Sequence, residues 1–426
     1  MVHTKKILRR EIIIMTGTKD LYEVICSMDN LYKAFLNAKK GKGWYKEVKL
    51  IEQRPFYYLA GLQYLLKNHL YRTSEYEVFT LTEGRKAREI YKLPFFPDRI
   101  AQWAILQVIE PFLIANMTKD TYSAIPGRGV QPIVDDLRGH YEVKKVNGKK
   151  MKEWIPSILV SREAETKYCY KIDLHHYYQS INHEILKEKF RKTFKDPELL
   201  WVVNEIIDSI ATANIDDISR IALLEEEVDP ETGIPIGNYM SQYCGNFYLS
   251  DFDHWIKEVK GVKFYYRYMD DITIFSDNKE SLHKLHKEVK AYLWENLRLT
   301  IKGNYQIFPT KVRGVDFVGY RFFGEYTLLR KSTALAMKRK MRGFRKKMEN
   351  NMKLRYGEWC SFNSYKGWLI HCDSYRLFQK YVSILIEYMQ NYYEKEVKGH
   401  GCVRKRSVKC GRGGGDGNKR VLCYYS

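Results

Sequence analysis

Three carboxylates in this sequence have the right type and surroundings to act together. Asp270 and Asp271 are adjacent in the stretch KFYYRYMDDITIFSD (263–277), where aromatic and β-branched residues flank them on both sides. These flanks predict two paired strands with MDD as the turn between them. Asp173 ends another predicted strand, YCYKID. Because a sheet can bring strand ends to one edge, we expect the three side chains to meet there.

Carboxylates at one sheet edge repel one another unless a cation neutralises them, and a hard divalent ion with oxygen ligands does so. Two Mg²⁺ ions about 4 Å apart would serve in-line phosphoryl transfer, lowering the pKa of an attacking hydroxyl and stabilising charge on the phosphorus. The Asp-Asp pair by itself is also compatible with a plain exposed turn. His175 and His176 follow Asp173, but we interpret them as loop or surface residues because hard ions prefer oxygen.

The elements that must position these acids alternate between helices and short strands. Apolar spacing predicts helices within residues 18–72, and alternation around a central turn predicts a hairpin at 76–93. Residues 140–166 are lysine-rich and poorly periodic, which favours an insertion or a loop. The order of the following elements predicts an α+β fold with helices packed on an antiparallel sheet. From about residue 330 the pattern is helical and basic.

The charge of the chain favours a polyanionic partner. Lys and Arg number 72 against 51 Asp and Glu, a formal net charge of +21, which most simply serves nucleic acid. A basic protein without such a partner is the alternative. The 34 Tyr residues suit stacking on bases or, alternatively, core packing. The eight cysteines form no C-x-x-C pair, which favours reduced thiols and a cytoplasmic protein. We find no apolar stretch suited to a signal peptide or a membrane span.

The sequence resembles the reverse transcriptases, most closely the bacterial and group II intron-like group, over roughly residues 20–385. YMDD (268–271) resembles their Y-x-D-D box, and KIDLHHYYQSI (171–181) resembles the first catalytic motif. Other stretches resemble further motifs in the family's order: AREIYKLPFFPDRIAQWAILQVIEP, TYSAIPGRG, GIPIGNYMSQ, LRLTIKGN, VDFVGYRF and SYKGWLIHC. One box is a poor classifier, whereas six boxes in order are strong.

The resemblance implies a right-hand polymerase fold of the α+β class. We expect fingers with N-terminal helices at 1–168 and a palm at 169–325 that contains a fingers segment near 215–238. A helical thumb would follow at 326–396, and a basic, Gly-rich, flexible tail at 397–426. Such enzymes bind template RNA, an RNA–DNA hybrid and dNTPs.

The resemblance also implies roles for single residues. The catalytic residues would be Asp173, Asp270, Asp271 and Lys302. Two Mg²⁺ ions, for which Mn²⁺ can substitute, would be held by Asp173, Asp270, Asp271 and the carbonyl of Leu174. The residues at the incoming dNTP would be Lys86, Arg88, Tyr178, Ile236, Gly237 and Gln242. Those at the primer and template would be Arg128, Tyr268, Met269, Phe317, Gly319 and Tyr320.

Physical chemistry supports several of these implied roles. The guanidinium of Arg88 matches phosphate oxygens bidentately, and Tyr178 would clash with a 2′-hydroxyl on the sugar. Gly237 would let the backbone approach the nucleotide, and Lys302 could donate a proton to pyrophosphate. The alternatives are a solvated charge for Arg88, a core tyrosine for Tyr178 and a lysine that only lines its strand for Lys302.

One departure from the family pattern indicates a subgroup. Ile236 replaces the usual glutamine of P-Q-G, and Ser241 and Gln242 replace the usual S-P. The resulting I-G-N-x-x-S-Q resembles diversity-generating retroelement enzymes, which are error-prone at template adenines and work with a small basic accessory protein. The alternatives are an antiphage-defence or group II intron-derived enzyme and, more remotely, a non-catalytic RNA-binding scaffold.

Overall fold

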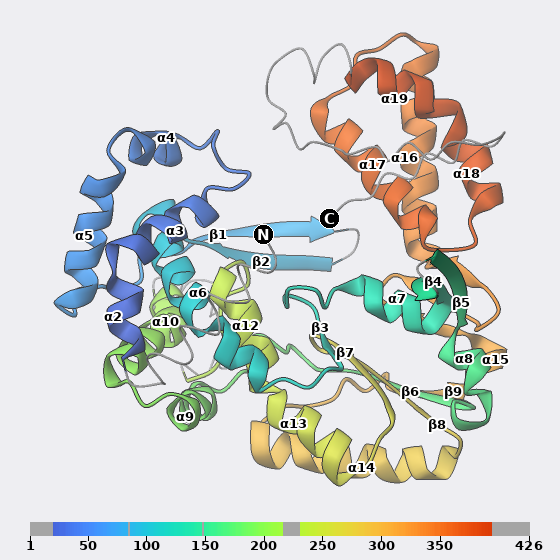
Figure 1. Cartoon of the computed structure of the whole chain (residues 1–426), viewed down its shortest axis with the longest axis horizontal. Helices are drawn as coiled ribbons and strands as arrows, with labels where there is room; N and C mark the ends of the chain where they lie inside the picture. The colour runs from blue at the N-terminus through green and yellow to red at the C-terminus, as the bar shows by residue number, and fades with distance from the viewer. Residues whose placement is uncertain (1–19, 84–85, 147–148, 216–230, 394–426) are drawn as a thin grey trace. The chain divides into compact units, whose positions relative to one another are not determined.

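The computed structural model describes residues 20–83, 86–146, 149–215 and 231–393 (Figure 1). Most of the predicted fingers segment at 215–238 and the tail at 397–426 lie outside the described residues. The chain divides into two compact units, Met1–Thr327 and Leu328–Ser426, which we describe separately. The predicted division of the chain into fingers, palm, thumb and tail remains a proposal.

Helices make up the first part of unit one, as predicted for residues 18–72. They are α2 (Leu21–Cys26), α3 (Met28–Ala38), α4 (Lys46–Gln53) and α5 (Pro55–Lys67), and a further helix, α6 (Ile100–Ala115), comes later in the chain. The side chain of Ser27 caps α3 by accepting from the backbone N–H of Asn30. Leu31, Ala34, Phe35 and Ala38 then form one buried stripe at helical spacing. Asn30 ties this helix to α6, because its Nδ2 donates to the carbonyl of Ala104 at 3.0 Å.

The predicted hairpin at 76–93 is confirmed. It consists of β1 (Glu77–Glu83) and β2 (Lys86–Lys92), which pair antiparallel. Further on, α7 (Val130–Arg138) leads into a second hairpin made of β4 (Gly139–Val146) and β5 (Lys149–Pro156). An insertion or a loop was expected at 140–166, and the structure has a hairpin in place of a loop over most of this stretch. Lysines hide the strand pattern, but cross-strand pairs such as Tyr141 with Trp154 stabilise the ribbon.

A five-stranded sheet forms the centre of unit one, in the order β3-β7-β8-β6-β9. Its strands are β3 (Thr121–Tyr122), β6 (Tyr168–Asp173), β7 (Phe264–Tyr268), β8 (Asp271–Ser276) and β9 (Gln306–Pro309). Only β3 with β7 is parallel among these pairs. Ile172 and Tyr265 belong to the same hydrophobic core as helix residues such as Val289, so the sheet and its helices are one packed body.

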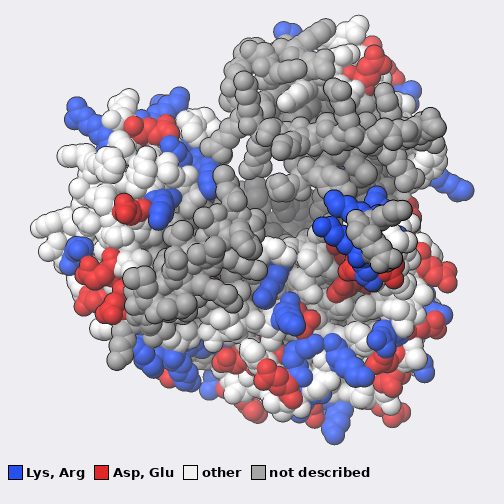
Figure 2. Space-filling model, in the orientation of Figure 1, with Lys and Arg blue, Asp and Glu red and all other residues white. Residues whose placement is uncertain are grey.

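The helices of this body follow the strands in sequence. They are α9 (His183–Thr193), α10 (Pro197–Ile215), α12 (Tyr239–Tyr248), α13 (Ser250–His254) and α14 (Lys279–Leu297). In Figure 1, α13 and α14 run along one side of the sheet. Figure 2 shows basic and acidic side chains interspersed over this part of the face. The mixture of helices and a mainly antiparallel sheet confirms the predicted α+β class.

A small antiparallel pair, β10 (Val315–Phe317) and β11 (Tyr320–Phe322), follows α15 (Thr310–Arg313). The chain then passes through β12 (Thr327–Leu329) into unit two. The longer elements of unit two are α16 (Lys331–Glu349), α17 (Tyr356–Ile370), α18 (Tyr375–Tyr381) and α19 (Ile386–Tyr392). Met337, Met341 and Phe344 form the buried stripe of α16. None of the helices in the described ranges is long and apolar enough to cross a membrane.

Candidate active site

Strand register brings the three predicted carboxylates to one edge of the sheet. β6 and β8 pair so that Asp173 lies opposite Asp271. β7 ends at Tyr268 and β8 begins at Asp271, so the turn contains Met269 and Asp270 alone. The predicted three-residue turn was wrong by one residue, because Asp271 pairs with Tyr268. Met269 has a φ of +55°, the left-handed conformation that a tight hairpin turn requires.

The carboxyls of Asp270 and Asp173 interact directly. Burial, the negative charge of Asp173 and a hydrogen bond with Asp173 together raise the pKa of Asp270 to about 6, and burial is the largest of these causes. A negative charge beside a carboxyl group disfavours its ionised form. The pair therefore favours a bound positive charge between its oxygens.

Two lysines form ion pairs with carboxylates of the cluster, one with Asp173 and one with Asp271. Lys302 Nζ lies 2.8 Å from Asp173 Oδ2, and the backbone N–H of Lys302 donates to the carbonyl of Asp173 at 2.9 Å. Lys171 Nζ lies 2.9 Å from Asp271 Oδ1 and donates to the carbonyl of Asp316 at 2.6 Å. Sequence reasoning missed Lys171. The signal was available, because residues two apart on a strand share a face, and Lys171 is two residues before Asp173.

The chemical type of the oxygen ligands at this edge of the sheet suits a hard divalent cation. All three side chains offer carboxylate oxygens, the ligands that Mg²⁺ prefers. In the described parts of the chain, no three His, Cys, Asp or Glu side chains gather closely enough to hold a metal ion between them. Leu174 has a buried side chain and faces Ile301 in an isolated bridge.

Tyr178 lies next to the turn. Its hydroxyl contacts Met269 Sδ at 3.5 Å, and its carbonyl accepts from the N–H of Ile234 at 2.9 Å. Its neighbour Tyr177 is buried and donates to the carbonyl of Gly245. Of this pair, Tyr178 is therefore the tyrosine whose side chain remains partly accessible beside the turn.

The stretch that carries Ile236 and Gly237 is hydrogen-bonded to the first hairpin. The carbonyl of Ile236 accepts from the N–H of Tyr91 on β2 at 2.9 Å. Gly237 has a φ of +122°, and a Cβ there would lie 2.8 Å from the carbonyl oxygen of Tyr91. Only glycine fits this close approach. Gln242 is exposed on α12.

The structure places the other predicted residues as follows. Lys86 and Arg88 are on β2, and their side chains lie outside the description. Arg128 Nη1 donates to the carbonyl of Thr118 at 2.7 Å, so part of its guanidinium is used within its own loop. Phe317 and Tyr320 are buried, and the turn between them is formed by Val318 and Gly319.

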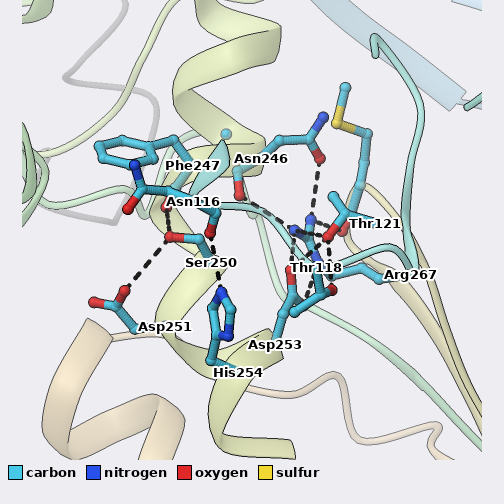
Figure 3. Close-up of polar contacts among 12 residues, drawn as sticks. Asn116, Thr118, Thr121, Asn246, Phe247, Ser250, Asp251, Asp253, His254 and Arg267 are labelled. Carbon is cyan, nitrogen blue, oxygen red and sulfur yellow. Dashed lines mark hydrogen bonds and ion pairs between the residues drawn. The ribbon is translucent and has the colours of Figure 1, made fainter. Parts of the chain in front are cut away.

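Arg267 forms a buried network behind the turn (Figure 3). Its side chain is fully buried and makes an ion pair with Asp253, with Nε 2.7 Å from Oδ1 and Nη2 2.5 Å from Oδ2. Nη1 donates to Asn246 Oδ1 and to the carbonyl of Met269, both at 3.1 Å. Sequence reasoning missed this arginine, although a single charge in a strand of aromatic residues is a signal for a buried partner.

A mainly antiparallel sheet with three aspartates at one edge, within an α+β fold, is the fold of the right-hand polymerases. Residues 83–322, more than half of the chain, match the family model described as reverse transcriptase (RNA-dependent DNA polymerase), and the chain belongs to this family. This is the family that the sequence predicted, and its description is that of an RNA-dependent DNA polymerase, a class of nucleotidyltransferase. No curated protein matches the sequence.

Several solved structures are similar to this chain at low identity. Telomerase from Candida albicans, in complex with a TWJ fragment of telomeric RNA, is 10% identical with a TM-score of 0.41, covering 77% of this chain and 61% of that one. The corresponding Candida tropicalis complex is 12% identical with a TM-score of 0.42, covering 76% and 58%. A partial Cas6-RT-Cas1–Cas2 complex is 18% identical with a TM-score of 0.33, covering 65% and 43%. This chain thus spans about three fifths of the telomerase chains.

Proposed function

We propose that this protein is an RNA-directed DNA polymerase that adds dNTPs to a primer 3′-hydroxyl on an RNA template. The observation that carries the proposal is the register of β6 and β8, which sets Asp173 opposite Asp271 while Asp270 occupies the adjoining turn. Family membership over residues 83–322 supports the same reaction. A template RNA, its RNA–DNA hybrid and dNTPs are then the partners, and the cytoplasm is the proposed compartment.

Asp173, Asp270 and Asp271 would hold two Mg²⁺ ions, with the carbonyl of Leu174 as a further ligand. When bound, the ions would activate the primer hydroxyl and stabilise charge on the transferring phosphoryl group. The primer oxygen forms a bond to the α-phosphorus while the bond to the departing pyrophosphate breaks. Lys302, whose ammonium lies at Oδ2 of Asp173, would give pyrophosphate its proton.

Residues around the carboxylates would select the nucleotide. Tyr178 contacts the turn through Met269 and is partly accessible there, which suits a steric check on the 2′ position of the sugar. Gly237 gives the backbone close access, while Lys86 and Arg88 would bind the triphosphate. Gln242 is exposed on α12 and would contact template or nucleotide.

The primer and template would lie along the turns of two hairpins. Tyr268 and Met269 flank the carboxylates on β7 and its turn. Phe317 and Tyr320 are buried, so their part would be to fix the turn at Gly319, whose backbone would face the primer. Arg128 would contact the template with the part of its guanidinium that Thr118 does not engage.

Primer extension tests the proposal directly. Purified protein is given an oligo(dT)-primed poly(rA) template, dTTP and Mg²⁺, and we expect extension by the native chain and none by Asp270→Asn. Asp277→Asn is the matched control, because Asp277 follows β8 and is exposed. Equal extension by Asp270→Asn and the native chain, or no extension by either, would overturn the proposed activity.

We infer further that the enzyme is of the diversity-generating type and makes errors at template adenines. Ile236 places an apolar, half-exposed side chain where the family pattern has glutamine, and its backbone is bonded to Tyr91. Less hydrogen-bonded checking of the nascent pair would follow. A small basic accessory protein would be its partner. We expect Ile236→Gln to lower misincorporation opposite adenine while extension on poly(rA) with dTTP persists. An unchanged error spectrum would instead favour an antiphage or group II intron-derived enzyme.

A further inference from the structure

The β4–β5 hairpin separates its charges by face. Cross-strand partners share a face of an antiparallel pair, and the register pairs Lys145 with Lys150 and Val143 with Lys152. We call this side the basic face; its members are Tyr141, Val143, Lys145, Lys150, Lys152 and Trp154. It carries three lysines and no acid. All six side chains are exposed, and none of the three lysines has an acidic partner within the described ranges.

The opposite face of the hairpin is neutralised and held to the body. Lys144 Nζ lies 2.5 Å from Glu153 Oε2, and His140 lies 3.4 Å from Glu142 through Nε2. His140 Nδ1 also donates to the carbonyl of Asp135 on α7 at 3.2 Å. The two glutamates of the hairpin therefore compensate charge on this side alone, and the basic face keeps its net positive charge.

An aromatic pair forms the base of the basic face. Tyr141 and Trp154 lie edge to face, with ring centroids 4.9 Å apart, yet they remain 67% and 47% exposed. A Cβ added to Gly139 would lie 2.7 Å from Trp154 Cζ2, so the indole lies directly over the backbone of Gly139. The backbone thus supports the ring from one side and leaves it accessible from the other.

The lysine arrangement costs stability unless something binds it. Lys145 and Lys150 are directly opposite each other, and like charges in that relation destabilise a strand pair. A two-stranded ribbon is only marginally stable by itself. A polyanion across the lysines would remove the repulsion, and exposed aromatic rings beside them would stack on unpaired bases. In Figure 2, Lys and Arg side chains gather beside the position of this hairpin.

We propose that the basic face is a binding site for single-stranded RNA. The lysines would contact successive phosphates, and Tyr141 and Trp154 would stack on bases, a combination that takes unpaired strands in preference to a duplex. The proposal rests on the proposed function in one respect, because the RNA would be template beyond the primer–template duplex.

The test measures binding of a labelled single-stranded RNA of mixed sequence to the full chain, without dNTPs or metal. The variant Lys145→Gln/Lys150→Gln/Lys152→Gln should bind roughly tenfold more weakly or worse, with a salt dependence of log Kd shallower by about 2, since each single-strand phosphate contact contributes about 0.7. Trp154→Ala should weaken binding by roughly tenfold, one base's stacking. In both variants the affinity for a blunt RNA–DNA hybrid should stay within about twofold of the native value, because the basic face takes unpaired strands in preference to a duplex.

Lys144→Gln is the matched control, because it removes a lysine from the same strand on the opposite face and should leave RNA binding unchanged. The triple variant alters only exposed side chains, so it keeps the test valid if Trp154→Ala disturbs the hairpin. Unchanged RNA affinity in the triple variant would overturn the proposal, as would an equal loss in Lys144→Gln or an equal loss for the blunt hybrid. Because binding is measured without catalysis, a failure to extend primers would leave this result standing.

Discussion

The guanidinium of Arg267 donates to the carbonyl of Met269 at 3.1 Å, and so joins a fully buried ion pair to the turn that carries Asp270. The same Nη1 also bonds to Asn246 on α12. Met269 adopts a left-handed conformation, which costs energy for a residue other than glycine. We therefore interpret Arg267 as a positioning residue that holds the turn in its shape.

Breaking the Arg267–Asp253 pair should cost far more than replacing it. We expect Arg267→Ala to lower the free energy of unfolding by about 3–5 kcal/mol, because Asp253 would remain charged and unpaired in the core. The double variant Arg267→Met/Asp253→Leu should lose less, since it leaves no buried charge. Urea unfolding of each variant measures this, and a double variant as unstable as the single one would contradict it.

The positive charge of the native Lys171 side chain should weaken cation binding at the carboxylates. Its ammonium lies 2.9 Å from Asp271, so Lys171→Met makes the site more negative by about one charge and should lower the Mg²⁺ concentration for half-maximal extension several-fold. Lys171→Arg keeps the charge and should stay near the native value. Primer extension across a Mg²⁺ series measures both, and a higher requirement in Lys171→Met would argue against the electrostatic account.

Tyr178 should control selection of the sugar. Tyr178→Ala removes the ring beside Met269 and should raise incorporation of ribonucleotides relative to deoxynucleotides by roughly tenfold or more. Tyr178→Phe keeps the ring and loses only the hydroxyl contact with Met269 Sδ, so it should discriminate as the native chain does. The test is the ratio of kcat/KM for rTTP to that for dTTP. An equal ratio in the native chain, Tyr178→Ala and Tyr178→Phe would exclude this role.

Two glycines near the site should differ in how well they tolerate replacement by alanine. Gly237→Ala forces a side chain onto the Tyr91 carbonyl at an unfavourable φ and should destabilise the chain by about 1–3 kcal/mol while raising the KM for dNTP. Gly245→Ala lies inside α12, where its Cβ would make an ordinary 3.4 Å contact with Tyr178, and should be tolerated. Thermal unfolding and nucleotide titrations measure the difference; similar losses in both would contradict it.

The sequence was enough to predict the α+β class, the hairpin at 76–93 and the approach of Asp173 to Asp270 and Asp271, because alternation and strand order determine them. Strand position pointed to Lys171 and Arg267, but the sequence could not predict their roles, which depend on which distant groups, such as Asp316 and Asp253, pack against them. The β4–β5 hairpin was missed for a related reason. Lysines on an exposed strand remove the apolar alternation, and only the cross-strand register reveals that they share one face.

Residue 302 is held in place by its backbone. The N–H of Lys302 donates to the carbonyl of Asp173, and this bond does not depend on the side chain at that position. A reporter group introduced there, such as a cysteine converted to a thiocyanate, would stand beside the carboxylates with its main chain unmoved. Its nitrile stretch would then record how the local electric field changes when a nucleotide binds.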